Sequence, residues 1–337
     1  MRAYYKVTMT ILTLGFLIIF SPIVRTSIYN SLTICAKFLI PSLFPFFIIS
    51  GMLFDFGIDI IFPPTLCSFI IGLFCGFPIG TKSLCESYNK ENLTKKQASA
   101  LLLCTANASP AFIVITLGEA ILKNKELGYL LLVCQAINAI SLYLLTVPKS
   151  NFKINKSITK DVSTSLIDNT KSATEQILFV CSMTTVFGIL FDLLATFLKG
   201  NFIKLSAFVE LLHGITLFDK KNLLIIAAVL GFSGICAISQ CIFFIKKTDL
   251  NIAYLFLGKI QASIVLPLYA TLFINNKLQY KIISLIIILL TNIGMMCIMN
   301  IKGCENKNDF FKKHRKMLRL LRTSNKNSFQ RTSTLPP

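Results

Sequence analysis

The sequence predicts an all-α polytopic membrane protein whose two halves each contain interrupted helices. The 337 residues are 54% hydrophobic and only 15% charged, whereas soluble domains contain about 25% charged residues. Several runs of roughly 20 residues carry almost no charge, which is the length that a transmembrane helix needs. Clusters of glycine and proline break some of these runs, and such breaks build binding sites in transporters.

The first helix is predicted within residues 1–30, as an uncleaved transmembrane segment. Arg2 and Lys6 precede an apolar run over residues 7–20, as in a signal peptide, but no small-residue cleavage site follows. The next segment, residues 34–58, contains Pro41 and Pro45 and is expected to be interrupted by them.

The most informative stretch follows the apolar run 67–75 and contains Gly76, Pro78, Gly80 and Lys82. Glycine costs about 1 kcal/mol and proline about 3 kcal/mol inside a helix. Backbone freed in this way is tolerated at membrane depth only when protein buries it or water reaches it. These residues therefore predict a broken helix, with Lys82 recognising a charged group of a solute. The alternative is that Lys82 extends to the membrane interface.

A second break is predicted at Asn107, Ser109 and Pro110. Thr94 and Gln97 have the spacing of a capping box, so a helix should start at Lys95 and reach this break. Asn107 and Ser109 offer neutral donors and acceptors beside backbone that the proline frees. A simple proline kink is the alternative.

The polar residues 149–172 are predicted to be a cytoplasmic linker between two repeats, residues 31–148 and 173–300. Its lysines outnumber its acidic residues, as in cytoplasmic loops. Gly76-Phe77 recurs as Gly231-Phe232 (231 − 76 = 155), and Pro110 recurs as Pro267 (267 − 110 = 157). Paired interruptions in corresponding positions indicate the binding site of a transporter with inverted repeats. Five segments precede the linker, so a cytoplasmic linker and N-terminus require one of the broken segments to be re-entrant.

The second half contains two candidate sites. Residues 202–218 form a short apolar segment in which Glu210 and His213 are expected on one helical face. Ionisable groups inside a membrane segment indicate function, here the coupling of transport to H⁺ or Na⁺, although both could lie in water at the interface. Gly231, Ser233 and Gln240 belong to the third break and its helix.

Composition argues against several other classes of function. The formal net charge of +19 has a large contribution from the basic tail 301–337, which is expected to be disordered, cytoplasmic and close to anionic lipid. The tail lacks the aromatic pattern of nucleic-acid binding. The eleven cysteines form no CxxC pair and only two histidines are present, so no metal and no cofactor are predicted.

An enzymatic function is not predicted. The only sequence pattern that suggests one is Gly231-Phe232-Ser233-Gly234, which matches the nucleophile motif of rhomboid-type intramembrane proteases. That family requires a histidine base on a later helix. The only later histidine is His314, in the tail, so an intramembrane serine protease at Ser233 is a remote alternative.

The two breaks of the first half resemble the sporulation integral membrane protein YlbJ family of the nucleoside-recognition (Gate) superfamily. The similar stretches are residues 76–82 and 102–113, with weaker similarity at residues 208–211 and 231–233. Thr81 replaces the family's usual alanine, and residues 105–106 depart from its asparagines. The resemblance covers roughly residues 35–275.

The resemblance implies a fold related to concentrative nucleoside transporters and a role in endospore formation. It further implies a multi-pass location in the cell membrane, on the mother-cell side in the membrane around the forespore. The implied substrate is a small anionic metabolite, with dipicolinate as the leading candidate. Alternatives are a nucleoside-type permease and a non-transporting membrane scaffold; a homo-oligomer is compatible with each. The expected binding residues are Gly76, Pro78, Gly80, Lys82, Asn107, Ser109, Pro110, Gly231, Ser233 and Gln240, with Glu210 and His213 for ion coupling.

Overall fold

The computed structural model describes residues 2–148, 161–198 and 200–300. Over these residues the chain is helical and contains no strand, which confirms the all-α class. The predicted tail 301–337 and residues 149–160 of the predicted linker lie outside the described residues. The chain divides into two units, residues 1–292 and 293–337. Of the second unit only the helical residues 293–300 are described, and the sites below belong to the first unit.

Among the described residues, 6 helical stretches are long and apolar enough to cross a membrane, which confirms a polytopic membrane protein. They are Ser21–Asp55, Lys125–Thr146, Val162–Phe197, Lys220–Ile245, Ala253–Ile274 and Leu278–Asn300. Large apolar side chains point outward along several of them: Leu144 is 72% exposed and Leu178 is 61% exposed. A soluble protein rarely exposes continuous apolar surface of this kind, whereas lipid covers it in a membrane.

The N-terminal helices differ from the expectation at two prolines. Helix α1 (Arg2–Ile19) is followed by α2 (Ser21–Ile34), a π-helical stretch (Cys35–Leu39) and α3 (Ile40–Asp55). The predicted interruption at Pro41 and Pro45 is wrong, because these last three elements form one continuous helix. Pro41 follows the π-helical stretch Cys35–Leu39, whose wider turn makes room for the proline ring inside the continuous helix. The predicted domain boundary after residue 30 falls inside this helix.

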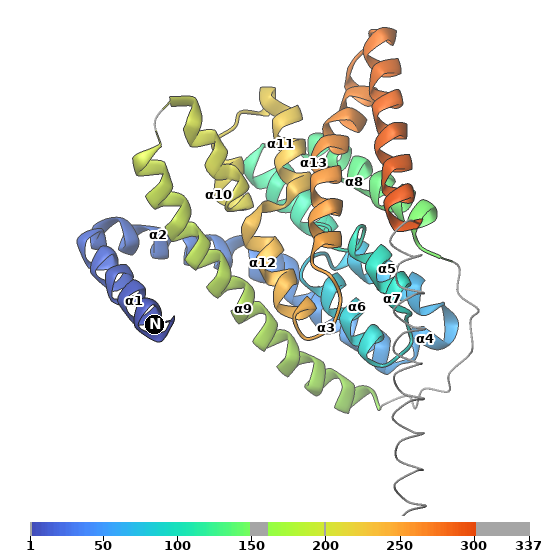
Figure 1. The fold of residues 1–337 in the computed structure, drawn as a ribbon, viewed down its shortest axis with the longest axis horizontal. Helices are drawn as coiled ribbons and strands as arrows, with labels where there is room; N and C mark the ends of the chain where they lie inside the picture. Colours follow the sequence, from blue (N-terminus) through green and yellow to red (C-terminus); the bar gives the residue numbers. More distant parts are fainter. Residues whose placement is uncertain (1, 149–160, 199, 301–337) are drawn as a thin grey trace, which may run out of the picture. The chain divides into compact units, whose positions relative to one another are not determined.

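Two half-length helices follow the short helix α4 (Ile58–Ile61). Helices α5 (Pro64–Phe74) and α6 (Ile79–Asn89) are 11 residues each, or about 16 Å, against about 30 Å for the hydrocarbon core. They fold back on each other, since a Cβ on Gly80 would lie 2.4 Å from the Cα of Gly72. The predicted break at residues 76–80 is therefore a hairpin with the geometry of a re-entrant segment (Figure 1).

The second break of the first half is also present. Helix α7 (Lys95–Leu102) begins with the predicted capping box, in which Thr94 and Gln97 bond each other's backbone N–H. The chain then unwinds and resumes as a helix that is π-helical over Phe112–Ile121. Helix α8 (Lys125–Thr146) packs against that stretch.

The second half begins with a long helix and a short irregular stretch, and further helices follow, the last of them Leu278–Asn300 (Figure 1). Their bounds are α9 (Val162–Phe197), a 3-10 stretch (Gly200–Phe208), α10 (Leu211–Ile215), a 3-10 turn (Lys220–Asn222), α11 (Leu223–Phe232), α12 (Gly234–Ile245) and α13 (Ala253–Ile274). Helix α9 thus begins inside the range 149–172 assigned to the linker.

The halves share one break but not the other. Helix α6 starts at residue 79 and α12 at residue 234, which is the predicted offset of 155 (79 + 155 = 234). By contrast, α13 is continuous through Pro267, so the expected break in the middle of this helix is wrong. Proline is tolerated inside membrane helices when neighbours satisfy the freed groups. The relation of the halves to nucleoside transporters stays a prediction.

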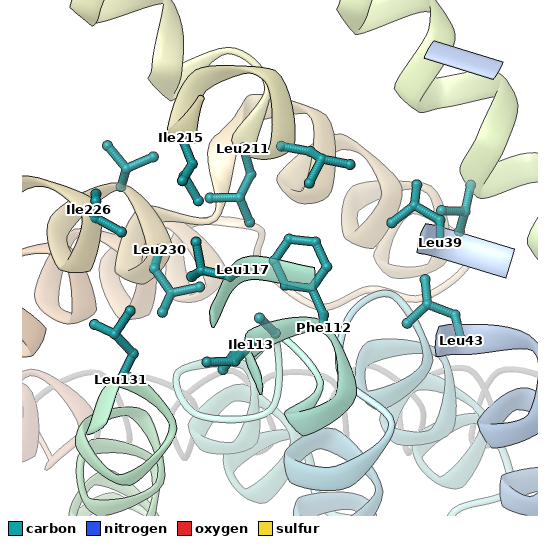
Figure 2. Packing of buried hydrophobic residues seen from close by; sticks show 14 of the residues in the cluster. Leu39, Leu43, Phe112, Ile113, Leu117, Leu131, Leu211, Ile215, Ile226 and Leu230 are labelled. Carbon is teal, nitrogen blue, oxygen red and sulfur yellow. The ribbon is translucent and has the colours of Figure 1, made fainter. Parts of the chain in front are cut away.

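A buried apolar cluster surrounds the breaks (Figure 2). Phe112, from the segment after the second break, lies among leucines of α3, α10 and α11, including Leu43, Leu211 and Leu230. This cluster joins elements from both halves and fixes the position of the unwound segments between them.

Candidate solute site

The two breaks of the first half lie against each other. Gly76 adopts φ +74°, and the N–H of Phe77 donates to the carbonyl of Asn107 over 2.6 Å. A Cβ on Gly76 would lie 2.6 Å from the backbone nitrogen of Ser109, so only glycine allows this approach. The sequence motifs that the resemblance pairs are thus in contact.

Side chains satisfy the unwound backbone of the second break. The Gln135 amide accepts from the N–H of Ala108 (3.2 Å) and donates to its carbonyl (2.8 Å). Asn107 donates to the carbonyl of Cys104 over 2.6 Å, and the hydroxyl of Ser109 accepts from the N–H of Phe112 over 3.2 Å. Buried backbone groups need such partners, so these polar residues first of all hold the break open.

The third break lies at Ser233. Ser233 and Gly234 adopt φ +71° and +78°, and α11 ends where α12 begins. The N–H of Cys236 donates to the carbonyl of Val209 over 3.0 Å, which ties this break to the segment that carries Glu210.

A buried lysine connects the breaks of the two halves. Lys259, on α13, donates to the carbonyl of Ala106 and, over 2.9 Å, to the hydroxyl of Ser233. Its ammonium therefore joins the second break to the third. Sequence reasoning did not select this residue, although a single ionisable group within an apolar span is the signal that identifies such sites.

Glu210 and His213 form a buried pair. Oε2 of Glu210 accepts from the backbone N–H of His213 and lies 2.7 Å from His213 Nδ1, while Nε2 of His213 lies 3.4 Å from the hydroxyl of Ser31. The expectation that both residues share one helical face is wrong: Glu210 is the N-cap of the short helix α10 and has extended backbone. An N-cap carboxylate accepts from the third helical N–H, which is why the two side chains meet despite the break.

Residues from all three breaks line one cavity among the helices. Its volume of about 40 Å³ exceeds the 10–15 Å³ that one water needs. Four predicted residues line it, and so do two phenylalanines and further groups that sequence reasoning missed. The lining residues used below are Phe77, Ser109, Phe112, Thr184, Glu210, Ser233, Cys236 and Gln240. In Figure 2, Phe112 lies next to the leucines that close the apolar side of this cavity.

Gln240 has an unused acceptor at the cavity. Its side chain is only 2% exposed, and Nε2 donates to the sulfur of Cys236 over 3.4 Å. Oε1 has no hydrogen-bond partner among the described residues. A buried amide oxygen without a partner costs about 1–3 kcal/mol, so this atom fits a hydrogen bond from water or a solute.

Lys82 lies at a different place from the other predicted binding residues. It lines a polar cleft of about 240 Å³ together with Asp55, Glu86 and Asn169; this cleft is called the Lys82 cleft below. Nζ lies 3.7 Å from Glu86 and 3.4 Å from the hydroxyl of Ser172. The structure thus does not bring Lys82 to the cavity that Ser109, Glu210, Ser233 and Gln240 line.

The remaining predicted residues shape the backbone rather than the cavity wall. Gly80 packs on Gly72, and a Cβ on Gly231 would lie 2.4 Å from the carbonyl of Ala262 on α13. Gly76 and Pro78 belong to the turn between α5 and α6, and Pro110 begins the helix that follows the second break. Among the described residues, no group of three or more His, Cys, Asp or Glu could hold a metal ion.

No family model matches the chain, and no curated protein or solved structure is significantly similar to it. The functional argument therefore depends on the geometry of the site.

Proposed function

We propose that this membrane protein is a secondary transporter of a small polar solute, which binds in the cavity between the three helix breaks. The observation that carries the proposal is the convergence of unwound segments from both halves on one buried cavity with the unpartnered acceptor of Gln240. Non-helical backbone at membrane depth lines binding sites in transporters of this kind.

The lining chemistry favours an uncharged polar solute over an anion. Serine hydroxyls and the Gln240 amide supply donors and acceptors, and Phe77 and Phe112 supply ring surface. Glu210 is the only ionisable carboxyl or amine among the described lining residues, so no lining side chain offers a cation to pair with an anion. We therefore place a nucleoside-type solute ahead of dipicolinate, whose recognition by Lys82 would require a route through the Lys82 cleft.

The small volume of the cavity indicates that this conformation is closed to the solute. A volume of about 40 Å³ holds water but not a nucleoside, so a solute binds only when the elements around the cavity separate. Glu210 lines this cavity and pairs with the buried His213, which supports a role of this pair in carrying a coupling proton. The role in endospore formation is supported by the resemblance of the two motifs alone.

The test is uptake by proteoliposomes that contain the purified full chain. We expect saturable uptake of a labelled nucleoside, stimulated by a proton gradient, and weak uptake of dipicolinate. Strong uptake of dipicolinate with none of nucleosides would reverse the proposed solute class. If no solute of either class is taken up, the scaffold alternative becomes the better account.

Ser233 gives a specific reason to test the protease alternative as well. Its hydroxyl contacts Lys259, and a neutral lysine can activate a serine. Lys259 here donates to the Ser233 hydroxyl, and that hydroxyl donates its own proton to the carbonyl of Leu230 over 3.1 Å, so the amine is not arranged as the base of this serine. We therefore expect a fluorophosphonate probe to leave Ser233 unlabelled; a covalent adduct at Ser233 that Lys259→Met abolishes would establish the hydrolase.

A further inference from the structure

The ammonium of Lys259 lies between two oxygens that the helix breaks have released. One is the carbonyl of Ala106, beyond the end of α7, and the other is the hydroxyl of Ser233. In transporters with broken helices, unwound carbonyls and helix C-terminal ends coordinate the coupling Na⁺. Here the ammonium of Lys259, rather than a free Na⁺, lies among the oxygens of the helix breaks.

The surroundings of Nζ are those of a monovalent cation. Its partners are neutral oxygens, and none of the ion pairs between described residues includes Lys259. An ammonium is a compact charge with three donors, so it can replace a small cation among such oxygens without requiring a carboxylate.

Close backbone packing brings the lysine to this position. A Cβ on Gly258 would lie 2.4 Å from the carbonyl of Leu103, so α13 touches the chain at the end of α7. The carbonyls at a helix C-terminus carry partial negative charge, which favours a cation there. Lys259 follows Gly258 directly and reaches the carbonyl of Ala106, just beyond the end of α7, from this contact.

From these contacts we propose that Lys259 is a built-in cation that holds the position of a coupling Na⁺, so that removing its side chain opens a site for a small monovalent cation. This proposal rests on the proposed transport function. The Lys259 ammonium would take the place of the coupling Na⁺, so transport would need no Na⁺ at this position. Cation binding at this position can be measured without any solute.

The experiment measures thermal unfolding of the purified full chain in detergent, in NaCl and in choline chloride of equal ionic strength. Wild type is expected to unfold at the same temperature in both salts. Lys259→Ala is expected to unfold at a lower temperature in choline and to recover by several degrees in NaCl or methylammonium chloride, with a saturable dependence on concentration. Bound ligand stabilises a folded state in this saturable way.

Two further variants make the result specific. Lys259→Met keeps the side-chain volume, so it should show no recovery with any cation. Lys82→Ala removes a lysine from the Lys82 cleft and should respond equally to both salts. If Lys259→Ala does not yield folded protein, Lys259→Ser provides the same opening together with a hydroxyl ligand.

Two outcomes would overturn the proposal. One is stabilisation of wild type by Na⁺ relative to choline, and the other is a folded Lys259→Ala or Lys259→Ser protein that no small cation stabilises. Because no solute is present, either outcome leaves the transport function standing. Conversely, absent uptake of every solute alongside a cation-responsive Lys259→Ala would overturn the transport function alone.

Discussion

One lysine, Lys82, lines the Lys82 cleft, and another, Lys259, joins the second and third helix breaks; the two have opposite surroundings. Lys82 is 24% exposed in its side chain and has a carboxylate neighbour, Glu86, at 3.7 Å. Lys259 is buried, and its hydrogen-bond partners among the described residues are neutral oxygens. An exposed ion pair contributes about 0–1 kcal/mol to folding stability. The free energy of a buried charge instead depends strongly on each of its partners, and losing one is costly.

In this chain, the glycine-proline motif predicts the break in the backbone correctly, but it does not identify the lysine that lies at the breaks. The glycines and proline before Lys82 build the α5–α6 hairpin, and Lys82 follows them on α6 into a polar cleft. Lys259 has no glycine-proline motif around it, yet it reaches two of the three breaks. We therefore expect the larger functional effect from Lys259, although no sequence motif surrounds it.

The largest effect is expected from replacing the two lysines separately. Lys259→Met should lower solute uptake about a hundredfold, or about 2.7 kcal/mol, because it leaves the Ala106 carbonyl and the Ser233 hydroxyl without the charged donor that joins the two breaks. Lys82→Met should lower uptake less than about threefold, because its ion pair is partly exposed. Initial rates in proteoliposomes with equal protein content measure both. The opposite order would return charge recognition to Lys82 and its cleft.

Stability separates the two regions in a second way. Gln135→Leu should lower the free energy of unfolding by about 2–4 kcal/mol, because it leaves the buried N–H and carbonyl of Ala108 without partners. Gln176→Leu is the matched control, since Gln176 bonds only to Ser172 within its own helix near the Lys82 cleft. Unfolding in detergent should show a clear loss for the first variant and little change for the second. Equal stabilities would mean that water replaces the Gln135 amide.

The sequence predicted the breaks well because glycine and proline act on the local backbone. The hairpin at residues 76–80, the unwinding before Pro110 and the interruption at Ser233 are all present. The predicted interruptions at Pro41, Pro45 and Pro267 failed, because the helix continues through each of them. At Pro41 the π-helical stretch Cys35–Leu39 accommodates the ring, and neither spacing nor composition indicates such a turn in advance.

The site was predictable only in part, because it depends on contacts between distant segments. Ser109, Glu210, Ser233 and Gln240 were selected from their local surroundings, and all four line the cavity. Lys259 acquires its role from Ala106, more than a hundred residues earlier in the chain. No local pattern describes that contact, although a lone lysine in an apolar span was itself a sufficient reason to select it.

Glu210 allows the coupling function of the cavity to be separated from solute binding. Glu210→Gln keeps an acceptor for the N–H of His213 but cannot exchange a proton near neutral pH. Accumulation driven by a pH gradient should fall about tenfold, while exchange of labelled for unlabelled solute at equal pH should persist. Glu119→Gln is the control, because this carboxylate is exposed and pairs with Lys125 at 3.7 Å. Loss of both activities would place Glu210 in solute binding rather than in coupling.

The smallest effect is expected where the corresponding turns of the two halves meet. Asp249 accepts from Lys95 over 2.8 Å and from the hydroxyl of Tyr88 over 2.7 Å, and these hydrogen bonds lower the pKa of its carboxyl. A lowered pKa stabilises the folded state above the carboxyl's unfolded pKa of about 4, and this contribution is lost as the pH falls through the folded value. Asp249→Asn should therefore destabilise the protein at pH 7 and destabilise it less at pH 3. The difference should stay below about 1 kcal/mol, because the side chains of Lys95 and Asp249 are 38% and 64% exposed and solvent screens them. Thermal unfolding at the two pH values measures it, and an equal effect at both would show that the contact acts through packing rather than charge.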